Sequence, residues 1–403
     1  MEGSRGGGLV HRRRLDQRRR MSKLTNVLFI SSYLDLGGGE TALLNLVDNL
    51  DHNRYLPHLL VRGEGQLAAA WRKRSWPVYI THWRGASTYF VPAVWALFPI
   101  SRRIEQLIRQ HDIQLVHSDY HTLPMALPAA ERAGIPALWW CWGWWFQPKL
   151  WQRAFFRRPA ATIALSKAIK AGFLGEPPFM PREQVDLIYS GVDTVRFKPG
   201  IDAAQIRADA GVDADAPLVA LLARFQDVKG HDVFQAMARQ VVRQIPEARF
   251  IVAGENTQTS ADNAYKTGIL ETAQTDPLLK NCLRYLGFRA DTERVMAAAD
   301  VVVCSSHFES YGMVNIEAMA SGKPVVSTNK GGPSETVAHG ETGYLVPPGD
   351  ATELAKHVID LLRDPDLRQR IGAAGRARVE QHFSVRAMAA QYTAVVERVL
   401  ERS

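Results

Sequence analysis

The chain has 403 residues, of which 46% are hydrophobic and 22% are charged, and its formal net charge is +8. This length is too great for one ordinary core and fits a soluble globular protein of two domains. Its three widely spaced cysteines, Cys141, Cys282 and Cys304, exclude a disulfide framework or zinc site as the basis of the fold and predict buried, reduced thiols.

The first twenty residues are strongly basic. They hold seven Arg against Glu2 and Asp16 and so supply +5 of the net charge. We interpret residues 1–20 as a disordered leader read from an upstream start codon, with Met21 as the natural start. A membrane tail and a signal peptide are alternatives, although the apolar stretch 26–34 is short and lacks an Ala-x-Ala cleavage site. No apolar run approaches the ~20 residues of a transmembrane helix, so we expect a cytoplasmic protein.

From residue 26 onward, short apolar runs alternate with longer amphipathic stretches. This rhythm is typical of βαβ units and predicts an α/β protein with two doubly wound parallel sheets that face one cleft. The turn-rich segment 197–200 separates an N-terminal domain, residues 21–197, from a C-terminal domain, residues 198–383, and a helical segment, 384–403, follows. The predicted strands are 26–32, 58–62, 78–81, 114–117, 137–141, 162–165 and 186–189 in the first domain, and 218–223, 249–253, 283–286, 301–304, 324–327 and 343–346 in the second.

A run of three glycines, 37–39, follows the first predicted strand. Glycine permits positive φ and a close approach of the backbone to a ligand. A dinucleotide fingerprint, Gly37-x-Gly39-x-x-Ala42, is a competing interpretation of the same loop. It is disfavoured because four residues separate the strand from Gly37, and because the second strand ends in Val61-Arg62 without the acidic residue that binds a ribose.

Six of the ten tryptophans lie between Trp139 and Trp151. Clustered tryptophans mark sugar platforms, membrane interfaces or partner surfaces. Lys149 and Arg153 interleave with aromatic residues in a way that suits anionic lipid, which predicts contact with the inner face of a membrane. The alternative is that these aromatic side chains pack the interior of the domain.

Arg224 and Lys229 follow the first strand of the second domain, in the segment ARFQDVKG. Both side chains would reach the cleft above that strand. A forked guanidinium and an ammonium together stabilise the negative charge that develops on a departing diphosphate. Two solvated loop cations are the alternative.

Glu309 and Glu317 stand eight positions apart in FESYGMVNIE, between a buried strand and a helix that starts near Gly312. Ligands in open α/β sheets bind beyond the carboxyl ends of the strands, and the first helix amides, near Met313 and Val314, attract phosphate or sugar oxygens. The two carboxylates therefore flank a predicted seat for a nucleotide-sugar. A solvated loop glutamate and a helix-dipole partner are the alternative roles.

These segments resemble the retaining glycosyltransferases of family 4, the glycosyl transferases group 1, which have the two-domain GT-B fold. Glu309 and Glu317 match the family's Glu-x7-Glu signature. Arg224 and Lys229 match its Gly-Arg-x4-Lys-Gly motif, with Ala223 in place of the first glycine. Shorter matches occur at Ser166-Lys167, at 189–193 and at Gly331-Gly332-Pro333-Ser334-Glu335, a loop that the family places beside the nucleotide and in which we expect Glu335 to be structural.

The resemblance implies transfer of a hexose, with retention of configuration, from a nucleoside-diphosphate sugar to a hydroxyl acceptor in polysaccharide, glycolipid or cell-envelope glycan synthesis. It implies that no metal or other cofactor is needed, because the cations and the helix dipole neutralise the diphosphate. It also implies that Glu309 holds sugar hydroxyls, that Glu317 holds the ribose, and that the C-terminal helix crosses back to the N-terminal domain. The donor contacts so implied are Gly38, Gly39, Arg224, Lys229, Glu309, Gly312, Met313, Val314 and Glu317.

The segment 115–121 leads from the fourth strand into the cleft, where family members often carry His-x-His. Asp119 stands at the second position of that pattern, so His117, Asp119 and His121 are all candidates to orient the acceptor hydroxyl or the donor. We assign a catalytic role to His117, and acceptor contacts to Asp119, His121 and Trp144. The basic and aromatic segment that follows Trp144 predicts a lipid-linked acceptor. A structural, hydrogen-bonded histidine is the alternative.

Three other functions fit parts of the chain. A sugar-nucleotide epimerase of the same fold would share the cleft. An NAD(P)-dependent oxidoreductase would explain the glycine-rich loop, but it would explain neither Arg224 and Lys229 nor the glutamate pair. A nucleic-acid-binding protein rests on residues 1–20 alone, so no nucleic-acid partner is expected.

Overall fold

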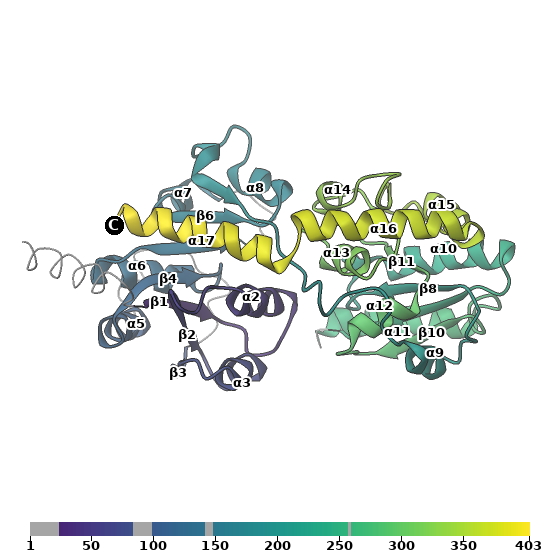
Figure 1. Cartoon of the computed structure of the whole chain (residues 1–403), viewed down its shortest axis with the longest axis horizontal. Coiled ribbons are helices and arrows are strands. Elements are labelled where there is room, and N and C mark those ends of the chain that lie inside the picture. The colour runs from purple at the N-terminus through teal and green to yellow at the C-terminus, as the bar shows by residue number, and fades with distance from the viewer. Residues whose placement is uncertain (1–23, 84–98, 142–147, 257–258) are drawn as a thin grey trace, which may run out of the picture.

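The computed structural model describes residues 24–83, 99–141, 148–256 and 259–403. They form two α/β domains that lie side by side along the long axis of the molecule (Figure 1). All thirteen strands lie within three residues of their predicted bounds. The basic segment 1–20 and the predicted acceptor residue Trp144 lie outside the described residues.

The N-terminal domain contains a seven-stranded sheet in the order β3-β2-β1-β4-β5-β6-β7. Every neighbouring pair is parallel, and the strand order reverses at β1, as in a doubly wound fold. The strands are β1 Thr25–Ser31, β2 Tyr55–Val61, β3 Val78–Ile80, β4 Ile113–Ser118, β5 Ala137–Cys141, β6 Ala161–Ala164 and β7 Val185–Leu187. The helices are α2 Gly38–Asp48, α3 Gln66–Lys73, α5 Pro99–Gln110, α6 Leu123–Ala133, α7 Leu150–Phe156 and α8 Lys167–Leu174.

The C-terminal domain contains a six-stranded parallel sheet in the order β10-β9-β8-β11-β12-β13. Its strands are β8 Leu218–Leu222, β9 Arg249–Ala253, β10 Leu283–Gly287, β11 Val301–Cys304, β12 Val325–Thr328 and β13 Tyr344–Val346. The helices are α9 Ala204–Ala210, α10 His231–Gln244, α11 Ser260–Thr275, α12 Thr292–Ala298, α13 Met313–Ala320, α14 Pro333–Thr336, α15 Ala351–Arg363 and α16 Pro365–His382, and the last helix of the chain is α17 Val385–Glu401.

Alternate residues of the central strands supply two cores in each domain. In β1, Leu28 and Ile30 belong to one cluster, and Val27 and Phe29 belong to the cluster on the opposite face. Successive side chains of a strand point to opposite faces, and helices cover both faces of these sheets. The central strands therefore read as continuous apolar runs rather than as alternating ones, which is why they are easy to predict.

The chain passes between the domains twice, at 190–197 and at 383–385. These crossings lie side by side, because Val192 N donates to Phe383 O at 2.8 Å and Val385 N donates to Val192 O at 3.1 Å. A Cβ on Gly191 would lie 2.6 Å from Ser384 O, so only glycine fits there. The second crossing leads into α17, which runs back over the N-terminal domain (Figure 1) and packs Tyr392 into its core.

The three cysteines are buried, and none forms a disulfide, as expected for reduced thiols. Within the described ranges, no helix has both the length and the apolar character needed to cross a membrane.

Candidate functional site

A cavity of about 960 Å³ opens between the two domains. Its walls come from the carboxyl ends of β8 and β11, from the start of α13, and, on the N-terminal side, from the starts of α2 and α8. It includes eight of the predicted site residues: Gly38, Gly39, Arg224, Lys229, Glu309, Gly312, Met313 and Val314.

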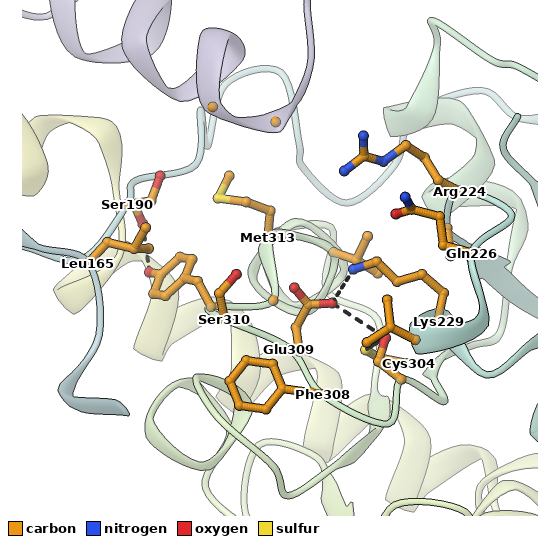
Figure 2. A pocket seen from close by; sticks show the side chains of 18 of the residues that line it. Leu165, Ser190, Arg224, Gln226, Lys229, Cys304, Phe308, Glu309, Ser310 and Met313 are labelled. Carbon is orange, nitrogen blue, oxygen red and sulfur yellow. Dashed lines mark hydrogen bonds and ion pairs between the residues drawn. The ribbon is translucent and has the colours of Figure 1, made fainter. Parts of the chain in front are cut away.

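An ion pair lies at the floor of the cavity. Lys229 Nζ is 2.6 Å from Glu309 Oε2, and the two side chains are only 21% and 15% exposed. Ser306 Oγ donates to the same oxygen at 3.4 Å. Figure 2 shows Glu309 between Lys229 and Met313, with the Arg224 guanidinium above the Lys229 ammonium group. The carboxylate and both cations therefore face one space, although they come from segments about 80 residues apart.

Backbone pairing fixes the position of Glu309. Glu309 N donates to Lys330 O at 3.2 Å, and Gly332 N donates to Glu309 O at 2.9 Å. Gly331, with φ of +89°, lies so close that an added Cβ would stand 2.0 Å from Glu309 O. The two glycines therefore let the loop 331–335 run directly against the glutamate. This close backbone contact explains why both positions are glycine.

The loop that carries Arg224 and Lys229 is held in a similar way. A short 3-10 turn, Asp227–Lys229, ends at Gly230, whose φ is +63° and whose added Cβ would lie 2.2 Å from Ser305 O. His231 begins α10, and its Nε2 lies 2.9 Å from Arg224 O. Burial lowers the pKa of His231, so its ring stays neutral and can donate from Nε2 to that carbonyl.

The start of α13 forms the third wall. Gly312 precedes it with φ of +85°, a left-handed conformation that suits glycine, and Met313 and Val314 line the cavity. The first amides of a helix have no partner within the helix and carry its positive dipole end, so an anionic oxygen is favoured at this point. Asn315 Nδ2 donates to Ser327 Oγ and ties the helix start to β12.

Glu317 is placed differently from Glu309. It is half-buried, and it does not belong to the cavity lining described above. Burial raises the pKa of Glu317 to about 7; the nearby Arg196 guanidinium acts in the opposite direction and the Glu293 carboxylate in the same direction. It lies four residues after Met313, hence about one turn further along α13 on the same side.

His117 lies in the core of the N-terminal domain instead of in the cavity. It is 3% exposed, its Nδ1 is 3.0 Å from the Tyr392 hydroxyl, and its ring contacts Phe29 and Trp140. Burial lowers its pKa to about 3, so it is neutral at ordinary pH. The predicted catalytic position therefore needs correction: strand alternation turns His117 toward α17, and the residue is a structural hydrogen-bonding partner.

Asp119 and His121 lie beyond the end of β4, also outside the cavity lining. Asp119 accepts hydrogen bonds from Thr122 N and Thr122 Oγ1 at 2.8 and 2.9 Å. Burial raises the pKa of Asp119. His121 Nε2 lies 3.0 Å from the hydroxyl of Tyr33, a residue that is 48% exposed and otherwise covered.

Two residues near this point, Tyr33 and Glu40, were not among the residues predicted from the sequence. Burial raises the pKa of Tyr33, and the carboxylates of Asp119 and Glu40 raise it further, whereas the Arg224 guanidinium of the other domain opposes them. Burial raises the pKa of Glu40, and the Asp119 carboxylate acts in the same direction, whereas the Arg224 guanidinium lowers it. Tyr33 and Glu40 thus stand beside the candidate acceptor residues and opposite a donor-side cation, a proximity that no local pattern indicates.

The comparisons with known proteins agree with this architecture. Residues 36–196 match the model of the Glycosyltransferase Family 4, and residues 202–378 match that of the Glycosyl transferases group 1. An alpha-maltose-1-phosphate synthase of Mycolicibacterium smegmatis is 30% identical over 264 residues, which cover 63% of this chain and 67% of the relative. The chain belongs to the group 1 glycosyl transferases.

Other relatives of this group 1 chain match over a shorter length. A D-inositol 3-phosphate glycosyltransferase of Segniliparus rotundus is 34% identical over 210 residues, or 52% of this chain and 46% of the relative. The matched region thus spans about half of that relative. Among solved structures, Anabaena HepE in complex with UDP and glucose has a TM-score of 0.74 at 24% identity, over 92% of this chain and 99% of that one. The predicted GT-B fold is confirmed.

Proposed function

We propose that the protein is a retaining glycosyltransferase that moves a hexose from a nucleoside-diphosphate sugar to a hydroxyl acceptor. The observation that carries the proposal is the convergence of Glu309, Lys229 and Arg224 on one cavity at the start of α13. A diphosphate at the helix start would meet both cations and the first helix amides. The names of the relatives, which include glycosyltransferases and a maltose-1-phosphate synthase, support the same reaction class.

In the proposed reaction, the bond between the anomeric carbon and the diphosphate breaks as the acceptor hydroxyl oxygen attacks from the same face, and the departing diphosphate oxygen takes the hydroxyl proton. Negative charge grows on the leaving oxygen, so Arg224 and Lys229 stabilise the transition state more than the bound donor. Glu309 accepts hydrogen bonds from the sugar hydroxyls, and Glu317, one turn along α13, accepts them from the ribose. His117 has no part in this scheme. We propose that no metal is needed, and transfer that persists in EDTA is the expected result.

The first prediction concerns donor binding. UDP, GDP and ADP sugars are added in turn, and one of them is expected to stabilise the protein by about 2.7 kcal/mol at ~100 times its dissociation constant. The Anabaena complex with UDP and glucose makes UDP-glucose the first choice. Arg224→Ala should reduce the shift in melting temperature, whereas Arg243→Ala, which removes an exposed arginine from α10, should leave it unchanged.

No stabilisation by any of these sugars would contradict the proposed donor site. If one of the sugars does bind, analysis of the products separates the candidate reactions. A new glycoside whose anomeric proton coupling matches that of the donor supports retaining transfer, whereas conversion of the donor to an epimer without an acceptor favours the epimerase. Synthesis of a polysaccharide, glycolipid or cell-envelope glycan is the proposed setting.

We further propose that α7 touches an anionic membrane surface, which suits a lipid-linked acceptor. Leu150 and Trp151, in its first turn, are 80% and 50% exposed. Lys149 precedes them, and Arg153 follows one turn later. Exposed apolar side chains beside cations are typical of a segment that lies in the lipid headgroup region.

Vesicle binding provides the second prediction. The protein is expected to sediment with vesicles that contain phosphatidylglycerol but not with purely zwitterionic ones, and binding should weaken in high salt. The double variant Leu150→Ser/Trp151→Ser should lose most of the binding. Val195→Ser removes a side chain that is 71% exposed in the interdomain segment, and it serves as the control. Equal sedimentation of the double variant and the wild type would refute the contact.

A further inference from the structure

The side chain of Glu335, in α14 of the C-terminal domain, makes its hydrogen bonds across the domain boundary. Its Oε2 accepts from Lys167 N at 2.8 Å, and its Oε1 accepts from Ala168 N at 3.0 Å. The Tyr189 hydroxyl donates to Oε2 at 2.9 Å. Burial and the Glu335 carboxylate both raise the pKa of Tyr189, so the phenol keeps the proton that it donates. A carboxylate of one domain thus satisfies the first amides of α8 in the other.

Two further contacts join the same segments. Ser166 Oγ donates to Ser310 O at 3.0 Å while it accepts from Ile169 N as the cap of α8. The Tyr311 hydroxyl donates to Ser190 O at 2.6 Å. Together with the contacts of Glu335, these bonds form what we call the domain joint: Ser166, Lys167, Ala168, Tyr189 and Ser190 on the N-terminal side, and Ser310, Tyr311 and Glu335 on the C-terminal side.

The domain joint adjoins the reacting groups on both sides. Ser310 and Tyr311 directly follow Glu309, and the loop that ends in Glu335 pairs with Glu309 through Gly331. On the other side, Ala168 and Ile169 of α8 line the cavity. Figure 2 shows Leu165 and Ser190 on the opposite side of the cavity from Arg224, with Glu309 and Ser310 between them. A shift at Glu335 would therefore change the separation of the two walls.

We propose that Glu335 is a positioning residue for sugar transfer: it holds the start of α8 against the loop that carries Glu309, and so sets the spacing of the donor-side and acceptor-side walls. This inference rests on the proposed function, in which the C-terminal domain holds the donor and the N-terminal domain presents the acceptor. Misplacement of reacting atoms by about 1 Å can slow a reaction by ~100-fold while binding persists. The loss of Glu335 should thus affect turnover more than donor binding.

The test compares Glu335→Gln with the wild type by hydrogen exchange and kinetics. Lys167 N and Ala168 N each bond to a different oxygen of Glu335, and an amide side chain cannot preserve this arrangement because one of its two polar atoms is a donor. Exchange at these two amides should become at least about tenfold faster, and kcat should fall by about tenfold or more. The dissociation constant of UDP should stay within about twofold. Tyr189→Phe leaves both hydrogen bonds from the backbone amides to Glu335 intact, and it should change amide exchange and kcat less than Glu335→Gln does.

Glu341→Gln changes an exposed glutamate in the turn that follows α14 and serves as the matched control. Its exchange rates and kcat are expected to equal those of the wild type. Unchanged exchange at 167 and 168 in Glu335→Gln would overturn the inference, and so would a fall in kcat without faster exchange. Loss of UDP affinity equal to the loss of kcat would assign Glu335 to donor binding and overturn it as well. Failure of the wild type to transfer any sugar would refute the proposed function, while the exchange measurement would still test the domain joint.

Discussion

Replacing Glu309 by Gln or Lys229 by Met is expected to lower kcat for sugar transfer by at least ~100-fold, with a folded protein. Each substitution removes a contact that strengthens as charge develops on the sugar and the diphosphate, and such contacts are worth ~100-fold or more each. In the free protein the two groups neutralise each other at 2.6 Å, and each lies mostly out of solvent. Loss of either leaves the other charge without its partner in the cavity. Steady-state kinetics with the donor identified by thermal shift measures the effect.

The double variant refines this test. Because Glu309 and Lys229 contact each other, their effects on kcat should not be additive, and the double variant should lose less than the product of the single losses. Lys330→Met removes an exposed cation from the neighbouring loop and should leave kcat within about twofold of the wild type. Near-normal turnover of both single variants would refute the site assignment.

Gly331→Ala is expected to lower the free energy of unfolding by about 2 to 4 kcal/mol and to reduce transfer by at least ~10-fold. Gly331 has φ of +89°, and an added Cβ would lie 2.0 Å from Glu309 O. No flexible side chain can move away to relieve that contact, because the clashing atom belongs to the backbone. The loop must shift, and the shift displaces Glu309 from Lys229. Denaturant unfolding and transfer kinetics of the same preparation measure both effects.

Gly340→Ala separates the effect of backbone strain at positive φ from the effect of the close contact with Glu309 O. Gly340 also has positive φ, +78°, but nothing lies within 4 Å of an added Cβ. Its substitution should lower the free energy of unfolding by only about 1 kcal/mol and leave transfer intact. Equal effects of the two substitutions on stability and transfer would show that the approach of Gly331 to Glu309 has no functional weight.

Much of the donor side was predictable because its residues follow strand ends directly. Parallel strands bring their carboxyl ends to one edge of a sheet, so Arg224 and Lys229 after β8 and Glu309 after β11 had to meet there. Prediction was harder on the N-terminal side, where His117 lies within a strand near its end. A shift of one residue along a strand moves a side chain to the other face, and no local pattern shows which face α17 covers.

The sequence by itself determined the two parallel sheets, the family and the cluster of donor-side charges, since these depend on short-range patterns of apolar runs, glycines and cations. Only the tertiary structure decided that His117 belongs to the core beside Tyr392, that Tyr33 and Glu40 lie across from Arg224, and that Glu335 binds the start of α8. The first and the last of these contacts join residues 275 and 168 positions apart, and Tyr33 and Glu40 belong to a different domain from Arg224. They form only when whole helices and strands pack together, so no local pattern of residues predicts them.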